Sequence, residues 1–261
     1  MNDAFELKQL SGHRVYWYPV IDSTNIGAKA LARAGEAHGA LVAADEQTHG
    51  RGRFDRKWLS RPGCGAWFTM LVRPQEGRVK TEDASGLVFV AALAMAKTLN
   101  TFAPGSVTVK WPNDLVSNNH KICGIMCEMS ATMQGLDWAV LGIGVNLTGF
   151  EFPEELPWAG SFESETGVKL TAQEVISSFL NQFDDLYDEW LKNGLPPILS
   201  SLTPLSATLN RHVRVIGQNG DTLTGTAVRF ESDGALVVDD GESLHILRAG
   251  DVSVRGMMDY V

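Results

Sequence analysis

Cysteine, long apolar runs and basic residues are all scarce in this sequence of 261 residues, which has three cysteines and a net charge of −9. Cys123 and Cys127 lie in a segment that reads as a strand, on one face but too far apart to bridge easily. No second Cys or His pair follows at the spacing of a zinc site. Free thiols are typical of a reducing compartment, so we expect a cytoplasmic protein.

Several other features are absent. No apolar run reaches the length of a transmembrane helix, and the first residues lack the pattern of a secretory signal, so neither a membrane span nor export is expected. The acidic composition leaves no basic face for nucleic acid. A P-loop pattern is missing, and Gly142-Ile143-Gly144 lacks the third glycine and the following helix of a dinucleotide site. We expect these strand glycines to make room for a ligand against the sheet.

Residues 47–58 (QTHGRGRFDRKW) concentrate positive charge in this acidic chain, with three arginines, a lysine and a tryptophan within eight residues. Arginine forks suit carboxylate and phosphate oxygens, and a tryptophan offers an apolar wall. The two glycines allow positive φ and a close approach of a ligand. The pattern indicates a loop around a small anion with a flat or apolar part. A solvated surface loop and an Arg–Gly segment that stacks on nucleic-acid bases stay open as alternatives.

Hydrophobic patterning predicts an α+β fold. Three strands that follow one another with short turns favour antiparallel pairing. The strands are expected at residues 16–20, 40–44, 66–72, 107–111, 122–129 and 138–145. Helices are expected at residues 26–34, 84–99 and 171–194, the last with a capping box of Thr171 and Glu174. The Pro-rich and Glu-rich stretch 151–167 reads as irregular surface.

The composition changes after the prolines at 196–204. Short alternating segments, among them 213–216, 223–230, 236–239 and 244–247, have Asp-Gly and Asn-Gly turns and predict a small C-terminal β-barrel of five short strands in about 50 residues. We therefore divide the chain into a catalytic domain, residues 1–204, and a small β-barrel domain, residues 205–261.

Three polar clusters stand at element boundaries, and each has an ordinary explanation. Ser23-Thr24-Asn25 suits a helix cap or a contact to a polar ligand group. The segment 110–114 (KWPND) suits a turn after a strand, or a cluster that holds phosphates or orients an amine. Lys121 stands at the start of a strand, where it is either a solvated surface lysine or a positively charged residue of the site.

Taken in order, these clusters resemble the biotin–protein ligase family. The matching motifs are S-T-N, Q-x-x-G-R-G-R-x-G-R-x-W, K-W-P-N-D-L, K-[LI]-x-G-I-L-x-E and G-[IL]-G-x-N-x. They stand here at residues 23–25, 47–58, 110–115, 121–128 and 142–147. The resemblance implies a class II synthetase-like domain, with a mixed or antiparallel sheet flanked by helices, and a barrel similar to a Src-homology-three domain. It implies ATP-dependent activation of biotin as biotinyl-5'-AMP and transfer to a lysine of a biotin carboxyl-carrier domain.

The resemblance also implies site residues. Those implied in catalysis are Arg51, Arg53, Lys121 and Asp114, with Asp114 our hypothesis for orienting or deprotonating the acceptor lysine. Those implied in biotin binding are Ser23, Thr24, Asn25, Gln47, Gly50, Arg51, Gly52, Arg53, Lys121 and Gly124. Those implied in ATP binding are Arg53, Trp58, Lys110, Asn113 and Asn146. Mg²⁺ is expected to be held mainly by the phosphates, so its protein ligands are left open.

The chain departs from the family pattern at Asp55, where a glycine is usual, and at His49, where a small residue is usual. Asp55 could pair with Arg56 and change how the loop closes. No helix-turn-helix precedes residue 16, so a ligase without DNA binding is expected. A homodimer is an open possibility. The alternatives are a lipoate–protein ligase, whose R-R-x-[ST]-G-G-G pattern is absent, and a non-catalytic RNA-binding module.

Overall fold

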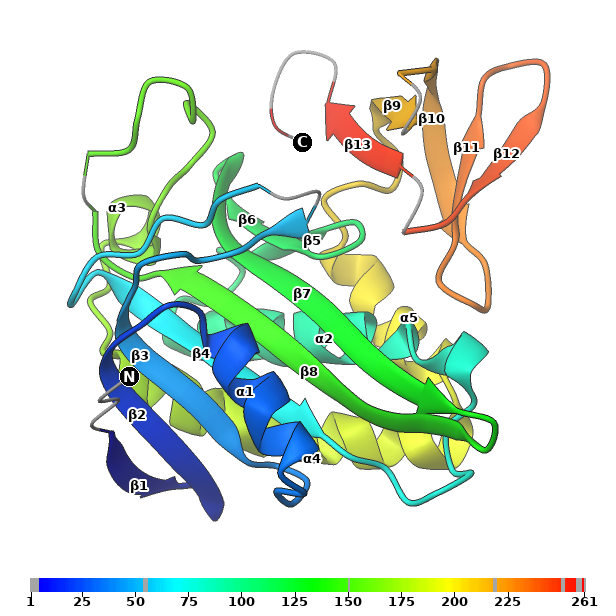
Figure 1. The fold of residues 1–261 in the computed structure, drawn as a ribbon. Coiled ribbons are helices and arrows are strands. Elements are labelled where there is room, and N and C mark those ends of the chain that lie inside the picture. The colour runs from blue at the N-terminus through cyan, green and yellow to red at the C-terminus, as the bar shows by residue number, and fades with distance from the viewer. Residues whose placement is uncertain are drawn as a thin grey trace.

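The computed structural model describes residues 5–53, 56–149, 151–217, 220–249, 252–256 and 260. Its largest element is an eight-stranded sheet with the order β1-β2-β3-β4-β8-β7-β6-β5 (Figure 1). The strands are β1 Glu6–Leu10, β2 His13–Ile21, β3 Leu41–Gln47, β4 Gly65–Val72, β5 Thr108–Lys110, β6 Asp114–Ser117, β7 His120–Thr132 and β8 Gly135–Asn146. Only β2 and β3 pair in parallel among these neighbours, so the sheet is mixed, as predicted.

The parallel pair needs a crossover, and helix α1, Thr24–Arg33, supplies it. Ser23 stands at the N-cap in an extended conformation, but its side chain makes no capping hydrogen bond. The hydroxyl of Ser23 is therefore not used as a helix cap. On its sheet side, α1 packs small residues, Ala28 and Ala32, against strands β3, β4 and β8.

The opposite face of the sheet is covered by α2, Gly86–Phe102, and α4, Ala172–Asn193, and α5, Pro196–Leu202, packs against both of these helices (Figure 1). In α4, the Thr171 hydroxyl accepts from the Glu174 N–H and the Glu174 carboxylate accepts from the Thr171 N–H, so the predicted capping box is confirmed. Phe179 and Phe183 of the same helix are fully buried against the sheet. The layers are thus α1, the sheet, and the α2–α4–α5 group.

One segment, Thr81–Phe102, is long and apolar enough to cross a membrane, although the sequence pattern predicted none. Within this segment, 67% of its apolar 18-residue window is buried inside the structure. Leu87, Leu93 and Met95 are among its fully buried side chains, so packing in the core accounts for its apolar composition.

Several elements were not predicted from the sequence, and α5 is one of them. β1 and β6 were not predicted, and the 151–167 stretch contains a short helix, α3, Phe162–Thr166, with a capping box of Ser161 and Ser164. β6 has only four residues, and its first residue, Asp114, was read as part of the turn at 110–114.

The C-terminal part forms a second, five-stranded antiparallel sheet with the order β12-β11-β10-β9-β13 (Figure 1). Its strands are β9 His212–Gly217, β10 Thr222–Phe230, β11 Leu236–Asp239, β12 Leu244–Leu247 and β13 Val252–Gly256. Trp111 links the two sheets, because its backbone N–H donates to Thr208 Oγ1 (2.9 Å) and its indole N–H donates to the Gly234 carbonyl (2.9 Å).

Candidate active site

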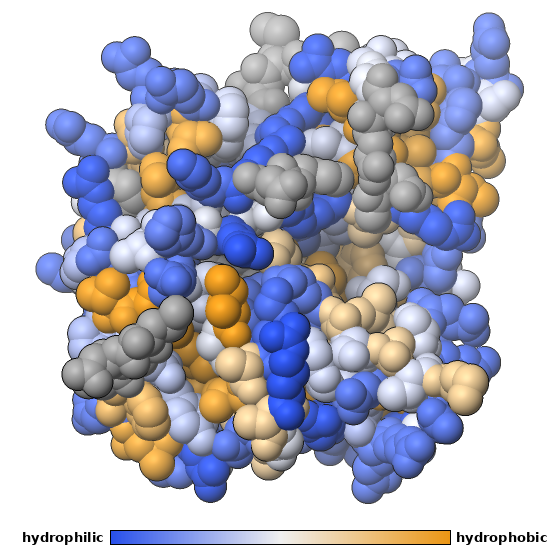
Figure 2. All heavy atoms as spheres, viewed as in Figure 1, coloured by the Kyte–Doolittle hydropathy of each residue, from blue (hydrophilic) through white to orange (hydrophobic). Residues whose placement is uncertain are grey.

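A cavity of about 690 Å³ lies between the eight-stranded sheet and the C-terminal sheet. The start of α1, the end of β3, the arginine loop, the β5–β6 turn, β7, β8, the 152–159 segment and β13 all contribute to its lining. Figure 2 shows hydrophilic side chains gathered across the middle of this face. A volume of this size is typical of small-molecule sites.

Nearly all the residues predicted for the site line this one cavity. They are Ser23, Thr24, Asn25, Gln47, Arg51, Gly52, Arg53, Trp58, Lys110, Asn113, Asp114, Lys121, Gly124 and Asn146. Gly50 does not line it. Residues from five separate motifs thus meet in space, which sequence order alone could not establish.

At one end of the cavity, neutral polar groups of α1 and β3 face each other. Gln47 Oε1 accepts from the Thr24 N–H (2.8 Å) and from the Thr24 hydroxyl (3.1 Å). Ser23 and Thr24 are almost fully buried, at 2% and 3% exposure. Because the Gln47 oxygen is engaged by a backbone donor, its amide nitrogen is left to donate elsewhere.

The Asn25 side chain is held by residues of other strands. Its Nδ2 donates to Glu128 Oε1 (3.1 Å), and its Oδ1 accepts from the Thr69 hydroxyl (2.7 Å). Lys29 Nζ lies 2.5 Å from the other Glu128 oxygen. Burial raises the pKa of Glu128, but its hydrogen bonds from Lys29 and Asn25 outweigh burial and lower it. Asn25 therefore ties α1 to β4 and β7 through both ends of its amide.

Gly124, Gly142 and Gly144 of β7 and β8 line the cavity, and they also make room for two protein side chains, which the sequence did not predict. A Cβ on Gly144 would come within 2.6 Å of the Trp58 indole, and one on Gly124 within 2.8 Å. These two glycines are register partners across β7 and β8. A Cβ on Gly142 would meet Asn25 Oδ1 at 2.1 Å. Trp58 therefore lies against the bare backbone of this pair and forms a wall of the cavity.

The arginine loop forms a hairpin over this sheet face. The Trp58 N–H donates to the Gly50 carbonyl (2.9 Å), and the Gly52 N–H donates to the Arg56 carbonyl (2.7 Å). Neither glycine has a positive φ. Instead, a Cβ on Gly50 would lie 2.5 Å from the Trp58 carbonyl, so close backbone approach is what requires glycine there. Asp55 lies outside the described residues. His49 is exposed and lies beside Asp22 at 3.6 Å.

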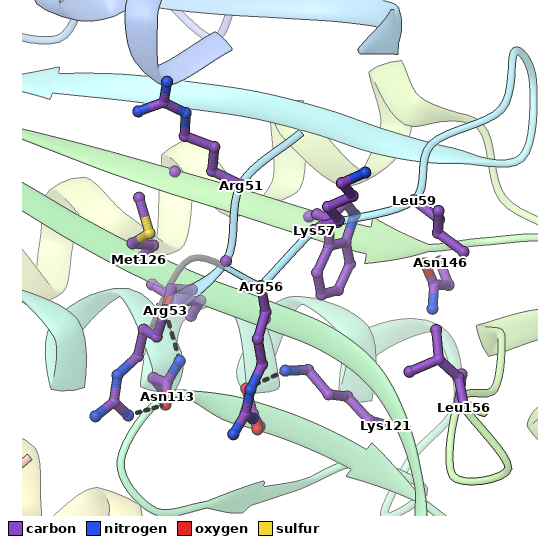
Figure 3. A pocket seen from close by; sticks show the side chains of 18 of the residues that line it. Arg51, Arg53, Arg56, Lys57, Leu59, Asn113, Lys121, Met126, Asn146 and Leu156 are labelled. Carbon is purple, nitrogen blue, oxygen red and sulfur yellow. Dashed lines mark hydrogen bonds and ion pairs between the residues drawn. The ribbon is translucent and has the colours of Figure 1, made fainter. Parts of the chain in front are cut away.

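The loop cations point in two directions. In Figure 3, Arg51 extends away from the group formed by Arg53, Arg56 and Lys121. Arg53 donates to Asn113 Oδ1 (2.8 Å) and to the carbonyl of Ala249, which links the loop to the C-terminal part. Asn113 in turn donates to the Ile125 carbonyl (2.8 Å).

Lys121, Asp114 and Lys110 form the charged floor at this end. Lys121 Nζ lies 2.6 Å from Asp114 Oδ1. Burial raises the pKa of the Asp114 carboxyl, but Lys121 and Lys110 outweigh burial and hold the pKa below its usual range. Burial lowers the pKa of Lys110 to about 7, against a smaller raising effect of Asp114. Burial also lowers the pKa of the Arg53 guanidinium.

The lining residues that were not predicted from the sequence include Trp158, Arg255 and Tyr260. Trp158 lies in the stretch read as irregular surface, and the other two belong to the C-terminal part. No motif marks them, because they reach the cavity only through the tertiary fold. Asn146, by contrast, was predicted, and it donates to the Gly160 carbonyl (2.9 Å) beside Trp158.

Within the described part of the chain, no group of three or more His, Cys, Asp or Glu side chains could hold a metal ion. Cys64, Cys123 and Cys127 are free thiols, as predicted.

Comparison with known proteins agrees with this geometry. The model of the biotin/lipoate A/B protein ligase family matches residues 17–146, and that of the biotin protein ligase C-terminal domain matches residues 208–255. The biotin–[acetyl-CoA-carboxylase] ligase of Paracoccus denitrificans is 32% identical over 248 residues, which are 90% of this chain and 98% of that protein. The chain belongs to the biotin protein ligase family.

Two more relatives support the assignment to the biotin protein ligases. The bifunctional ligase/repressor BirA of Bacillus subtilis is 31% identical over 254 residues, 96% of this chain and 77% of that protein. The biotin protein ligase of Aquifex aeolicus, solved in complex with biotin and ATP, is 26% identical with a TM-score of 0.79, over 93% of this chain and 98% of that one. As a biotin protein ligase, the chain is an enzyme.

Proposed function

We propose that this biotin ligase joins biotin and ATP in the 690 Å³ cavity, releases pyrophosphate, and passes the biotinyl group to a lysine of a biotin carboxyl-carrier protein. One observation carries the proposal. A neutral polar group (Ser23, Thr24, Gln47) and a basic group (Arg53, Lys110, Lys121) line one cavity with Trp58, whose ring lies 5.4 Å from Lys121 Nζ. Such a cavity suits a molecule with a ureido ring, an apolar body and a carboxylate that must meet a phosphate.

In the first step, a biotin carboxylate oxygen attacks the α-phosphorus of ATP. An acyl–phosphate bond forms, the bond to the β-phosphate oxygen breaks, and pyrophosphate leaves. Two anions must approach, so fixed cations have to offset their repulsion. We assign this role to Arg53, Lys121 and Arg51, with Arg51 swinging in from the outward direction seen in Figure 3.

In the second step, the neutral amine of the acceptor lysine attacks the carbonyl carbon of biotinyl-adenylate. An amide bond forms, the bond between the carbonyl carbon and the phosphate oxygen breaks, AMP leaves with that oxygen, and the proton lost by the amine passes to solvent. Asp114, at the turn beside Lys110, is the carboxylate that we expect to contact the acceptor amine. Since its pKa is lowered, it is a weak base that orients the amine and accepts its hydrogen bond as positive charge develops.

We assign the biotin end to the groups that the cavity gathers around the start of α1. Ser23, Thr24 and Gln47 contact the ureido group, and Gly52 and Gly124 border the body of biotin beside Trp58. Asn25 acts there by fixing α1 through Glu128 and Thr69. Gly50, which does not line the cavity, supports the loop.

We assign the nucleotide end to Arg53, Trp58, Lys110, Asn113 and Asn146. The donor set there is cationic and amide-bearing, and its carboxylate, Asp114, is already paired with Lys121. This composition suits Mg²⁺ that is held by phosphate oxygens, where it would neutralise their charge.

The division into residues 1–204 and 205–261 is part of the proposal, and the separate C-terminal sheet of β9–β13 supports it. A cytoplasmic location is supported by the free thiols. We also propose a homodimer that pairs through β1, one of the two end strands of the large sheet, and sedimentation of the purified chain tests it.

The test of the function uses the purified chain with ATP and either biotin or lipoate. We expect mass spectrometry to detect biotinyl-adenylate, and a carrier domain added afterwards to gain one biotin on one lysine. If lipoyl-adenylate forms and biotinyl-adenylate does not, the chain is a lipoate ligase instead. Failure to form either adenylate would refute the proposal.

A further inference from the structure

Tyr260 is a buried residue of the cavity to which neither the motifs nor the proposed reaction gives a role. Its side chain is 8% exposed. The hydroxyl donates to Asp114 Oδ2 at 2.5 Å, and the ring faces Lys110, whose Nζ lies 3.4 Å from the ring centroid. One side chain therefore touches Asp114 and Lys110, two of the three polar residues of the KWPND turn that we assign to the reaction.

The Tyr260 ring is held from its other sides by aromatic and cationic partners. It stacks on Trp158 with centroids 6.0 Å apart and an angle of 12° between the ring planes. The Arg255 guanidinium of β13 lies 5.2 Å from the Tyr260 ring and 5.4 Å from the Trp158 ring. Cation–π and stacking contacts of this kind favour a fixed ring orientation. Tyr260 thus joins the C-terminal part to the catalytic turn.

Together with Lys121, Tyr260 provides a partner for each carboxylate oxygen of Asp114. Lys121 occupies Oδ1 at 2.6 Å and Tyr260 occupies Oδ2, so both carboxylate oxygens have a fixed partner. Burial raises the pKa of the Tyr260 phenol above its ordinary value, and Asp114 raises it further. The hydroxyl keeps its proton and stays a donor to the carboxylate over the working pH range.

The ring also sets the surroundings of Lys110, which is 3% exposed. The charges that face Lys110 come from several elements: Asp114 of β6, Lys121 of β7, Arg56 of the loop and Arg255 of β13. Because the ring covers the ammonium, removing the ring would let water reach it and raise the pKa of Lys110 from about 7.

We infer that Tyr260 is a positioning residue of the ligase reaction, which holds Asp114 through its hydroxyl and Lys110 through its ring. The inference rests on the proposed function, since it gives these two residues their tasks in transfer and nucleotide binding. The hydroxyl governs the transfer step, where Asp114 meets the amine. The ring governs the charge state of Lys110, and with it the binding of ATP.

The experiment compares Tyr260→Phe, which removes only the hydroxyl, with Tyr260→Ala, which removes the ring as well. Adenylate formation is followed by pyrophosphate exchange, and transfer is followed with purified biotinyl-adenylate and carrier. Tyr16→Phe is the matched control, because the Tyr16 hydroxyl also donates to a carboxylate (Glu36, 2.6 Å) but lies outside the cavity.

For Tyr260→Phe we expect kcat of transfer to fall about tenfold, the effect of losing one hydrogen bond to a charged group, with adenylate formation unchanged. In the wild type, KM for ATP should rise as Lys110 loses its proton near pH 7. In Tyr260→Ala we expect the same loss of transfer and, in addition, a rise of KM for ATP that begins at a higher pH. Transfer by Tyr260→Phe at the wild-type rate would overturn the hydroxyl role. Equal losses in both steps at every pH, together with a lower Tm, would show a structural role only.

A measurement without turnover separates this inference from the proposed function. The lysines are labelled by reductive ¹³C-methylation, and the Lys110 signal is assigned by its loss in Lys110→Arg. We expect its titration near pH 7 in the wild type and in Tyr260→Phe, and at higher pH in Tyr260→Ala. An unchanged titration in Tyr260→Ala would refute the ring role whether or not the chain forms an adenylate.

Discussion

The indole of Trp58 lies against the backbone of Gly144, so closely that a Cβ on that glycine would come within 2.6 Å of the ring. The contact explains why the segment Gly142-Ile143-Gly144 contains two glycines although it is not a dinucleotide-binding motif. The glycines of the G-x-G segment are needed for side chains that build the site, Asn25 at Gly142 and Trp58 at Gly144.

Gly144→Ala should therefore displace Trp58 and weaken biotin binding. We expect Kd for biotin to rise at least about tenfold and the free energy of unfolding to fall by about 1–3 kcal/mol, the usual cost of overpacking. Titration calorimetry with biotin and chemical denaturation measure the two effects. Gly149→Ala is the control, since a Cβ there would meet its nearest neighbour, Ser161 Oγ, at 3.7 Å. Wild-type affinity in Gly144→Ala would show that Trp58 is no wall for biotin.

Arg53→Gly should release biotinyl-adenylate into solution. Arg53 joins the loop to Asn113 and to the Ala249 carbonyl, so its loss would free the loop from both partners. We expect more free adenylate and biotin on lysines of unrelated proteins, because closure shields the adenylate from water. Mass spectrometry of the solution and of an added bystander protein measures both. Arg61→Gly, an arginine outside the cavity lining, is the control, and adenylate retention in Arg53→Gly equal to that control would contradict the prediction.

Binding of ATP should take up a proton above pH 7. Burial lowers the pKa of Lys110 to about 7, so the empty site holds this lysine largely neutral at pH 8. A phosphate beside it favours the ammonium form and raises its pKa, so affinity for ATP should fall as the pH rises through 7. Calorimetry in buffers of different ionisation enthalpy should show uptake approaching about one proton per ATP at pH 8. Lys110→Gln should abolish the uptake, and equal uptake in that variant would assign the proton to another group.

The sequence and the structure agree where a local rule determines the outcome. The Thr171–Glu174 capping box and the end of α4 at Gly194 were predicted correctly, because both depend on residues within one turn of the helix. The motif residues were readable for another reason, their order along the chain. Their meeting in one cavity depends on the register of β7 with β8 and on the crossover through α1.

The rest depends on contacts between distant segments, which no local pattern encodes. Trp158 and Tyr260 stack although they lie in a loop after β8 and beyond β13. Glu128 stood inside a quoted motif without a role, and its bonds to Asn25 and Lys29 of α1 supply one. The two glycines of the arginine loop suggested positive φ, whereas the structure shows a close backbone approach at Gly50.

Asp114→Asn should separate the two steps of the reaction. The amide keeps the shape of the side chain but removes the charge that orients the acceptor amine, so we expect transfer to fall about 100-fold or more. Adenylate formation should change less, because its cations remain.

Asp137→Asn is the control, as Asp137 pairs with Arg73 at 3.2 Å outside the cavity. Single-turnover transfer from purified biotinyl-adenylate to the carrier measures the step directly. Since the lowered pKa keeps Asp114 ionised through the neutral range, the loss should be the same at pH 6.5 and at pH 8.5. Full transfer by Asp114→Asn would remove this carboxylate from the reaction and leave it the structural partner of Lys121.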